Sequence, residues 1–222
     1  MYEEIRRRKK RKFDNIGIIV CTIVGGICIV ALCCRLLLYN DNEGVIKSDN
    51  LTSTEVSLLN DGDIIMRKGF GFVSNKIVEL LDESRPISHC GIVVKTKKGV
   101  GVIHSVSNTL SDIDGVQICS IQQFCKDSKD SSIVVVRLRD TADMPAANIA
   151  SEAKIYLNRK VQFDNSFDLS DSSRMYCSEI VWKILLDNYN LDIYPNKNDV
   201  FTLGFAPFFD TTNFAVVIDH FE

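Results

Sequence analysis

From Leu58 onward, short apolar runs alternate with turn residues, and this pattern predicts the regular elements of the chain. Helices are predicted at residues 73–81, 145–157 and 177–186; Pro145 suits a first helical turn, and in the last range apolar residues are spaced three and four apart. Runs rich in Val and Ile predict strands at residues 63–66, 91–95, 100–106, 133–138 and 214–219. The strands cluster in the middle of the sequence with helices on either side. We therefore expect an α+β fold rather than a βαβ sheet.

The N-terminal segment has a different pattern. Residues 6–12 read RRRKKRK, and residues 16–34 are 19 consecutive positions without a charge. As a helix, these 19 residues would extend roughly 28 Å, close to the ~30 Å hydrocarbon core of a bilayer. We expect a cytoplasmic basic segment at 1–15, a transmembrane helix at 16–39, a linker at 40–57 and one folded domain at 58–222. A cleaved signal peptide is the alternative, but the apolar run is long for one and no small-residue cleavage site closes it.

Charge is divided unevenly between these parts. Residues 1–40 contain eight Lys or Arg and three Asp or Glu, whereas residues 41–222 contain 18 and 26. Because basic residues stay on the cytoplasmic side, the folded domain would lie on the exported side of the membrane, periplasmic or extracellular. That domain is acidic and offers no basic surface for nucleic acid. The composition, 45% hydrophobic and 25% charged, excludes a disordered or collagen-like chain.

The chain contains three histidines, two of them in predicted strands. His89 opens the run HCGIVV, and His104 lies in GVIHSV after a turn at residues 97–99. On neighbouring antiparallel strands, two such side chains can lie side by side on one face. Two partly buried structural histidines are the simpler interpretation. His220 is close to the C-terminus, where we expect a solvated side chain.

Four cysteines fall in the predicted domain, and one has an unusual position. Cys177 begins the amphipathic run CSEIVWKILL at a helix N-terminus, where the helix dipole and free N–H groups lower a thiol pKa and can hold an oxyanion. A small apolar residue on a buried helix face is the alternative. Cys90 follows His89 and should point to the opposite sheet face, into the core. Cys119 and Cys125 could form a disulfide, which the sequence leaves open.

Three segments, taken together in this order, resemble the permuted papain-like hydrolases of the NlpC/P60 superfamily, in the YiiX/YaeF-like branch. They are LNDGDIIMRKGFGFVSNKIVELL at 59–81, SHCGIVVKTKKGVGVIHSVS at 88–107 and FDLSDSSRMYCSEIVWKIL at 167–185. In ordinary members of the superfamily the cysteine helix precedes the histidine strands, whereas in the permuted branch it follows them, as here. The resemblance implies a papain-like, circularly permuted antiparallel sheet packed with helices.

The resemblance also implies roles for three residues. Cys177 matches the nucleophile, His89 the general base, and His104 the polar residue that orients the base. Many relatives have a glutamate at the third position, but a neutral histidine can also accept the N–H hydrogen bond that sets the base tautomer. In the segment KVQFDNSF, where relatives often have a tyrosine, Gln162 or Asn165 could supply a hydrogen-bond donor instead. No metal or organic cofactor is implied.

The function expected from these features is a membrane-anchored cysteine hydrolase, an amidase or endopeptidase that cleaves an amide bond in a cell-wall peptide or a related acyl-amide. One alternative keeps the Cys-His-His site but acts on a lipid acyl ester or N-acyl amide, as a hydrolase or acyltransferase. Another alternative is a non-catalytic, membrane-anchored binding module. The expected partners are the membrane, through the N-terminal helix, and a peptide-amide or lipid acyl substrate.

Overall fold

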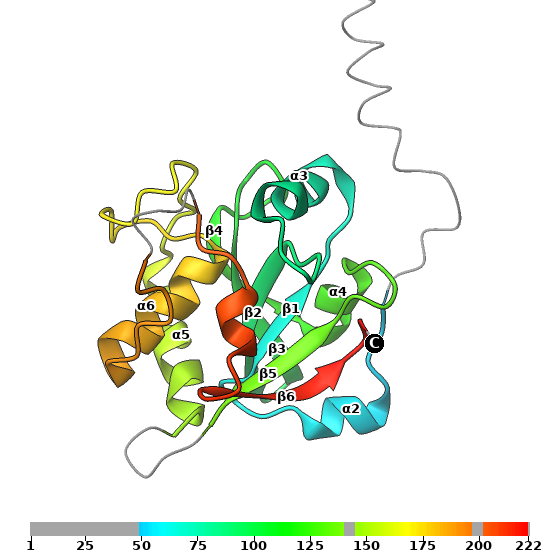
Figure 1. The fold of residues 1–222 in the computed structure, drawn as a ribbon. Helices are drawn as coiled ribbons and strands as arrows, with labels where there is room; N and C mark the ends of the chain where they lie inside the picture. The colour runs from blue at the N-terminus through cyan, green and yellow to red at the C-terminus, as the bar shows by residue number, and fades with distance from the viewer. Residues whose placement is uncertain (1–48, 140–144, 197–201, 222) are drawn as a thin grey trace, which may run out of the picture. The chain divides into compact units, whose positions relative to one another are not determined.

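A computed structural model describes residues 49–139, 145–196 and 202–221 (Figure 1). All of them belong to one compact unit, residues 46–222. The predicted basic segment, the transmembrane helix at 16–39 and the first part of the predicted linker lie outside the described residues. Within the described ranges, no helix is long and apolar enough to cross a membrane. The proposed anchor therefore stays a prediction.

Six antiparallel strands form a single sheet in the order β4-β3-β2-β1-β5-β6 (Figure 1). The sheet comprises β1 (Ile64–Arg67), β2 (His89–Thr96), β3 (Gly99–Val106), β4 (Gly115–Ser120), β5 (Val134–Leu138) and β6 (Phe214–Asp219). This confirms the predicted α+β class and the antiparallel sheet. Strand β4 was not predicted, because it alternates buried and exposed positions and leaves Ile118 44% exposed, so it lacks a continuous apolar run.

Each face of the sheet has its own hydrophobic core, because side chains alternate between faces along a strand. On one face, residues such as Met66 and Ile92 pack with the buried sides of α5 (Ala147–Arg159) and α6 (Cys177–Tyr189). On the other face, Ile65 and Val93 pack with Phe124 and its neighbours in α4 (Ile121–Lys126). In Figure 1, α5 and α6 lie together on one side of the sheet. His89 and His104 lie on strands of the sheet, whereas Cys177 lies at the start of a helix. These candidate site residues therefore come from different layers of the fold.

Two helices fall in the predicted ranges at 145–157 and 177–186, and a third, α3 (Gly71–Leu81), in the range at 73–81. A short 3₁₀ helix, η2 (Ala206–Phe209), precedes the last strand. The expectation that residues 40–57 lack regular structure is wrong at their C-terminal end, where Ser53–Leu58 form α2. The Thr52 hydroxyl accepts from the Glu55 N–H, and the Glu55 carboxylate accepts from the Thr52 N–H, which is a capping box. At six residues, α2 is too short to show a hydrophobic period.

The C-terminal end of the chain is tied to the first described residues. His220 Nδ1 lies 2.9 Å from the Asp49 carboxylate, and His220 Nε2 lies 2.9 Å from Glu55. Burial lowers the pKa of His220, but the hydrogen bonds to Glu55 and Asp49 outweigh it and raise the pKa above its ordinary value. Asp49 also accepts the backbone N–H groups of Ser132 and Ile133. The expectation of a solvated tail histidine is therefore wrong.

Candidate active site

Cys177 is the first residue of α6, and the extended residue Tyr176 precedes it as the N-cap. The Cys177 side chain is partly exposed and packs against the core between α6 and the sheet. The Tyr176 hydroxyl accepts the Leu203 N–H at 3.1 Å, which holds the start of the helix in place. The first N–H groups of a helix have no partner within it, so the thiol lies at the electropositive end of α6.

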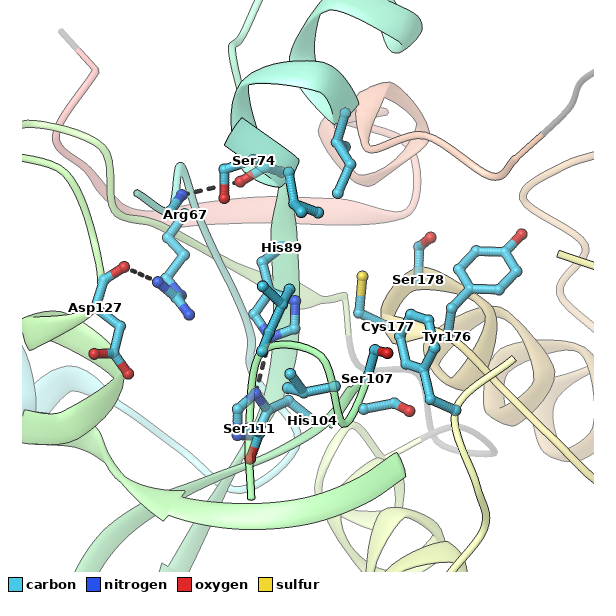
Figure 2. Close-up of a pocket in the computed structure, with 18 of the residues that line it drawn as sticks. Arg67, Ser74, His89, His104, Ser107, Ser111, Asp127, Tyr176, Cys177 and Ser178 are labelled. Carbon is cyan, nitrogen blue, oxygen red and sulfur yellow. Dashed lines mark hydrogen bonds between the residues drawn. The ribbon is translucent and has the colours of Figure 1, made fainter. Parts of the chain in front are cut away.

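The two candidate histidines are hydrogen-bonded to each other. His89 Nε2 lies 2.8 Å from His104 Nδ1, and Figure 2 shows the His89 ring with His104 on one side and Cys177 on another. Burial, the charge of His89 and the charge of Arg67 hold the pKa of His104 well below its ordinary value, so His104 is neutral. Its Nδ1 can therefore accept the proton of His89 Nε2–H. That tautomer leaves Nδ1 of His89 free to act on Cys177.

Gly91 makes room for the histidine pair. It belongs to the same sheet face as His89, two residues further along β2, and it lies beside His104 of β3. A Cβ atom built on Gly91 would be 2.5 Å from the Val102 side chain, 3.0 Å from the Ile103 carbonyl oxygen and 3.1 Å from the His104 Cβ. Alanine at this position would therefore displace His104 or separate the strands. The glycine of the HCG sequence has a steric role that was not assigned from the sequence.

Cys90 and His89 both act on the pKa of the Cys177 thiol. The Cys90 hydrogen bond holds the pKa of Cys177 well below its ordinary value; burial opposes this, and the His89 hydrogen bond and charge add to it. Burial and the same contact raise the pKa of Cys90. The two thiols are therefore coupled, and the lowered pKa belongs to Cys177. Cys90 is buried in the core as expected, but its contact with Cys177 was not foreseen.

The thiols of Cys119 and Cys125 have raised pKa values, in contrast to that of Cys177. Burial raises the pKa of Cys119 to about 11, and burial also raises the pKa of Cys125. Both thiols are free, so the disulfide that the sequence left open is not formed in this structure. A thiolate is the reactive form of cysteine, and these two residues are therefore internal references for the reactivity of Cys177.

One cavity of about 600 Å³ brings the three candidate residues together. Cys177, His89 and His104 all line it, and they come from α6, β2 and β3. The volume is within the range of about 300–1,000 Å³ that small-molecule sites occupy. The arrangement places one thiol and two imidazole groups around a single cavity.

A family model described as permuted papain-like amidases, YaeF/YiiX, C92 family, matches residues 58–204. The chain belongs to this family. A solved structure that resembles it is the crystal structure of metalloprotein YiiX from Escherichia coli O157:H7, with a TM-score of 0.56 and 22% identity over 72% of this chain and 97% of that one. At this identity the likeness shows the fold alone. A comparison with curated proteins gave no match.

Membership of the YaeF/YiiX family confirms the resemblance and supports hydrolase chemistry on an amide bond. It is YiiX from E. coli that is described as a metalloprotein. In the part of this chain that the structure describes, no group of three or more His, Cys, Asp or Glu residues could hold a metal ion.

Of the two residues considered as extra donors, one reaches the cavity. Asn165 lines it, and its Oδ1 accepts a hydrogen bond from the Ser107 hydroxyl at 3.1 Å, which turns the amide nitrogen away from Ser107. Gln162 is exposed and its backbone forms a bridge with Arg174 instead. Of the two residues, Asn165 is therefore the one that lies at the cavity of this YaeF/YiiX-type site.

Arg67 and Phe124 also lie next to the two histidines. The Phe124 ring lies 5.9 Å, centroid to centroid, from the rings of both His89 and His104, and the Arg67 guanidinium lies 4.8 Å above the same ring. Arg67 Nη1 donates to the Asp127 carbonyl oxygen. These residues come from β1 and from α4 and its C-terminal end, and no local motif marks them. Sequence reasoning therefore missed them.

Glu179 provides a pH-dependent contribution to stability. It is 1% exposed, and its carboxylate accepts the Tyr176 N–H at 3.2 Å. Burial outweighs that hydrogen bond and raises the pKa of Glu179 from 4.5 to about 8. Between these pH values the folded chain retains a proton that the unfolded chain has released, so Glu179 contributes less stability as the pH rises through this window.

We expect Glu179→Gln to remove this dependence. In urea unfolding at pH 5 and pH 9, the loss of stability on raising the pH should be smaller in the variant by a few kcal/mol, since each unit of pKa shift corresponds to about 1.4 kcal/mol. Other titrating groups cancel in the comparison of the two proteins. A difference between wild type and variant that is the same at both pH values would contradict the assignment.

Proposed function

We propose that the chain is a cysteine amidase in which Cys177 is the nucleophile, His89 the general base and His104 the residue that positions His89. The observation that carries this proposal is the hydrogen-bonded pair His89–His104 beside a thiol of lowered pKa at the start of α6. The family match over residues 58–204 supports the reaction class.

The proposed reaction has two halves. His89 takes the proton of the Cys177 thiol, the resulting thiolate attacks the carbonyl carbon of the substrate, a C–S bond forms, and the N–H groups at the start of α6 hold the oxyanion. The imidazolium of His89 then gives its proton to the leaving amine as the C–N bond breaks. Water next attacks the thioester, His89 accepts its proton, and the C–S bond breaks to release the carboxylic acid and restore the thiolate. His104 stays neutral and holds the His89 ring throughout.

Membrane anchoring by residues 16–39, with the amidase domain on the exported side, is part of the same proposal. It rests on the basic run at 6–12 and the uncharged run at 16–34. Both a cell-wall peptide and a lipid acyl-amide would be within reach of a domain held in this way. The composition of the cavity bears on the choice between them.

The proposal is tested by hydrolysis of labelled amides by the full-length protein. A labelled muropeptide, an N-acyl amino acid and a phospholipid are each incubated with wild type and with a Cys125→Ala control, and the released amine or acid is measured. We expect one of the two amides to be cleaved at equal rates by the two proteins. Failure of both amides, together with a Cys177 thiol no more reactive than Cys119, would favour a non-catalytic binding module and contradict the proposal.

A further inference from the structure

Arg67 brings a positive charge to the wall of the cavity that contains Cys177. Among the described residues that line this cavity, it is the only Lys or Arg. In the described part of the chain its side chain forms no ion pair, and its Nε atom is buried without a hydrogen-bond partner. A charge removed from water is costly unless a group of opposite charge neutralises it. The guanidinium therefore favours an anion in the cavity.

The carboxylate of Asp127 does not bind this guanidinium. It accepts two hydrogen bonds from the side-chain nitrogen of Gln123, both at 3.0 Å. Only the main-chain carbonyl oxygen of Asp127 accepts from Arg67 Nη1, and Figure 2 shows the carboxylate pointing away from Arg67. Burial lowers the pKa of Arg67, and the charge of Asp127 offsets this only in part. The ring of Phe124 attracts the cation but offers it no acceptor oxygen.

The start of α3 adds further donors beside the guanidinium. Its N-cap, Phe70, makes no side-chain capping hydrogen bond, and the first turn contains no acidic residue, so the first N–H groups keep a partial positive charge. A Cβ atom built on Gly69 would lie 2.5 Å from Ser74 Oγ and 3.5 Å from Arg67 Nη1. The hydroxyl and the guanidinium therefore border a space that the glycine leaves open. All four of these residues line the cavity.

This group of donors lies next to the proposed general base. Arg67 and His89 are directly opposite each other in the antiparallel pair β1–β2, where paired side chains lie on the same face of the sheet. Figure 2 shows Arg67 on one side of the His89 ring and Cys177 on the other. In the proposed reaction the acyl group stays bonded to Cys177, whereas the amine takes its proton from His89. The substituent of the amine therefore extends toward Arg67.

We propose that Arg67, Ser74 and the start of α3 bind a carboxylate carried by the leaving amine, so that the amine released from the substrate is an amino acid; this inference rests on the amidase function proposed above. A planar carboxylate can accept two parallel hydrogen bonds from a guanidinium, and its single charge neutralises the single charge of the arginine. An uncharged amide lacks this group beside the scissile bond. A tetrahedral anion such as phosphate shares the charge but not the planar geometry, and the test includes one for that reason.

The test is the rate at which charged methanethiosulfonates modify Cys177 in the full-length protein, read by peptide mass spectrometry. The thiolate attacks the sulfenyl sulfur, a disulfide forms and methanesulfinate leaves. Three ethyl reagents are compared, which end in a carboxylate, a sulfonate or an uncharged hydroxyl, and each rate is divided by the rate with 2-mercaptoethanol. We expect the carboxylate reagent to react at least about tenfold faster than the hydroxyl reagent and about threefold faster than the sulfonate reagent.

Three variants locate the effect. Arg67→Gln removes the charge from the cavity wall, Ser74→Ala removes only a hydroxyl, and Lys76→Gln removes an exposed cation of α3 that pairs with Glu79 and does not line the cavity. We expect the ratio of carboxylate to hydroxyl rates to fall by at least about tenfold in Arg67→Gln, by about threefold in Ser74→Ala and by less than about twofold in Lys76→Gln. If Arg67→Gln does not fold, Ser74→Ala, which keeps every charge, decides the question.

The outcomes separate the two proposals. A fast hydroxyl reaction without a preference for the carboxylate, or a preference that Arg67→Gln and Ser74→Ala leave unchanged, would overturn the carboxylate inference and leave the amidase proposal intact. A sulfonate reagent as fast as the carboxylate reagent would indicate a site for a tetrahedral anion, and an equal loss in Lys76→Gln would indicate a general surface attraction. Either result overturns the inference. A Cys177 thiol that reacts slowly with all three reagents would contradict the amidase proposal, and with it the inference.

Discussion

Replacing Cys177 by alanine is expected to abolish amide hydrolysis, with kcat/KM falling by more than about 10⁴-fold. The reason is that no other described thiol near the substrate is activated: Cys119 also lines the cavity, but burial raises its pKa to about 11, and Cys90 is fully buried with a raised pKa. The measurement is release of the amine from the amide that wild type cleaves, under saturating and subsaturating substrate. Cys177→Ser should also lose most of the activity, because a hydroxyl is ionised far less than a thiol at neutral pH.

The matched control for this change is Cys125→Ala. Cys125 is also a free thiol, but it is buried in the core of the other sheet face and does not line the cavity. Wild-type turnover in Cys177→Ala, in a protein with an unchanged circular dichroism spectrum, would exclude Cys177 as the nucleophile.

Replacing His89 by alanine is expected to lower kcat/KM by about 10²–10⁴-fold, the usual contribution of a general base. Loss of the imidazole also removes a hydrogen bond and a charge that lower the pKa of Cys177. The activity that remains should therefore rise with pH toward the ordinary thiol value of 9.0, and the activity of wild type should reach its plateau at lower pH. The measurement is the pH profile of kcat/KM for both proteins.

His220→Ala is the control for the loss of a histidine, since His220 is bound to Asp49 and Glu55 and does not line the cavity. Its pH profile should match that of wild type. If His89→Ala keeps the wild-type acid limb, another group must deprotonate Cys177, and the assignment of His89 as the base is wrong.

Long apolar runs made much of the fold predictable. The Val- and Ile-rich stretches became β2, β3, β5 and β6, and the apolar period after Cys177 became α6. Three short elements were missed: α2 and α4 have six residues each and are too short for a helical period, and β4 is an edge strand that leaves Ile118 exposed. Secondary structure is thus predictable here where burial is continuous along the sequence.

The site was predictable where chemistry and local structure coincide in the sequence, as for Cys177 at a helix start and for two histidines on neighbouring strands. Alternation along β2 also placed Cys90 on the face opposite His89. The alternation of side chains along a strand predicts which face of the sheet a residue lies on, but not which helix covers that face. The contact of Cys90 with α6 could therefore not be predicted. Arg67 and Phe124 are in contact although they lie far apart in the chain, and no local sequence pattern predicts such a contact.

The measurement that tests the central claim most directly is alkylation of each cysteine by iodoacetamide as a function of pH, in full-length wild type and His89→Ala, read by peptide mapping. The account predicts that Cys177 of wild type reacts fast well below pH 8 and that His89→Ala shifts this reaction to higher pH. Cys119, whose pKa is raised to about 11, and Cys125 should stay slow in both proteins. A Cys177 thiol no faster than these two, or one that is indifferent to the loss of His89, would contradict the account.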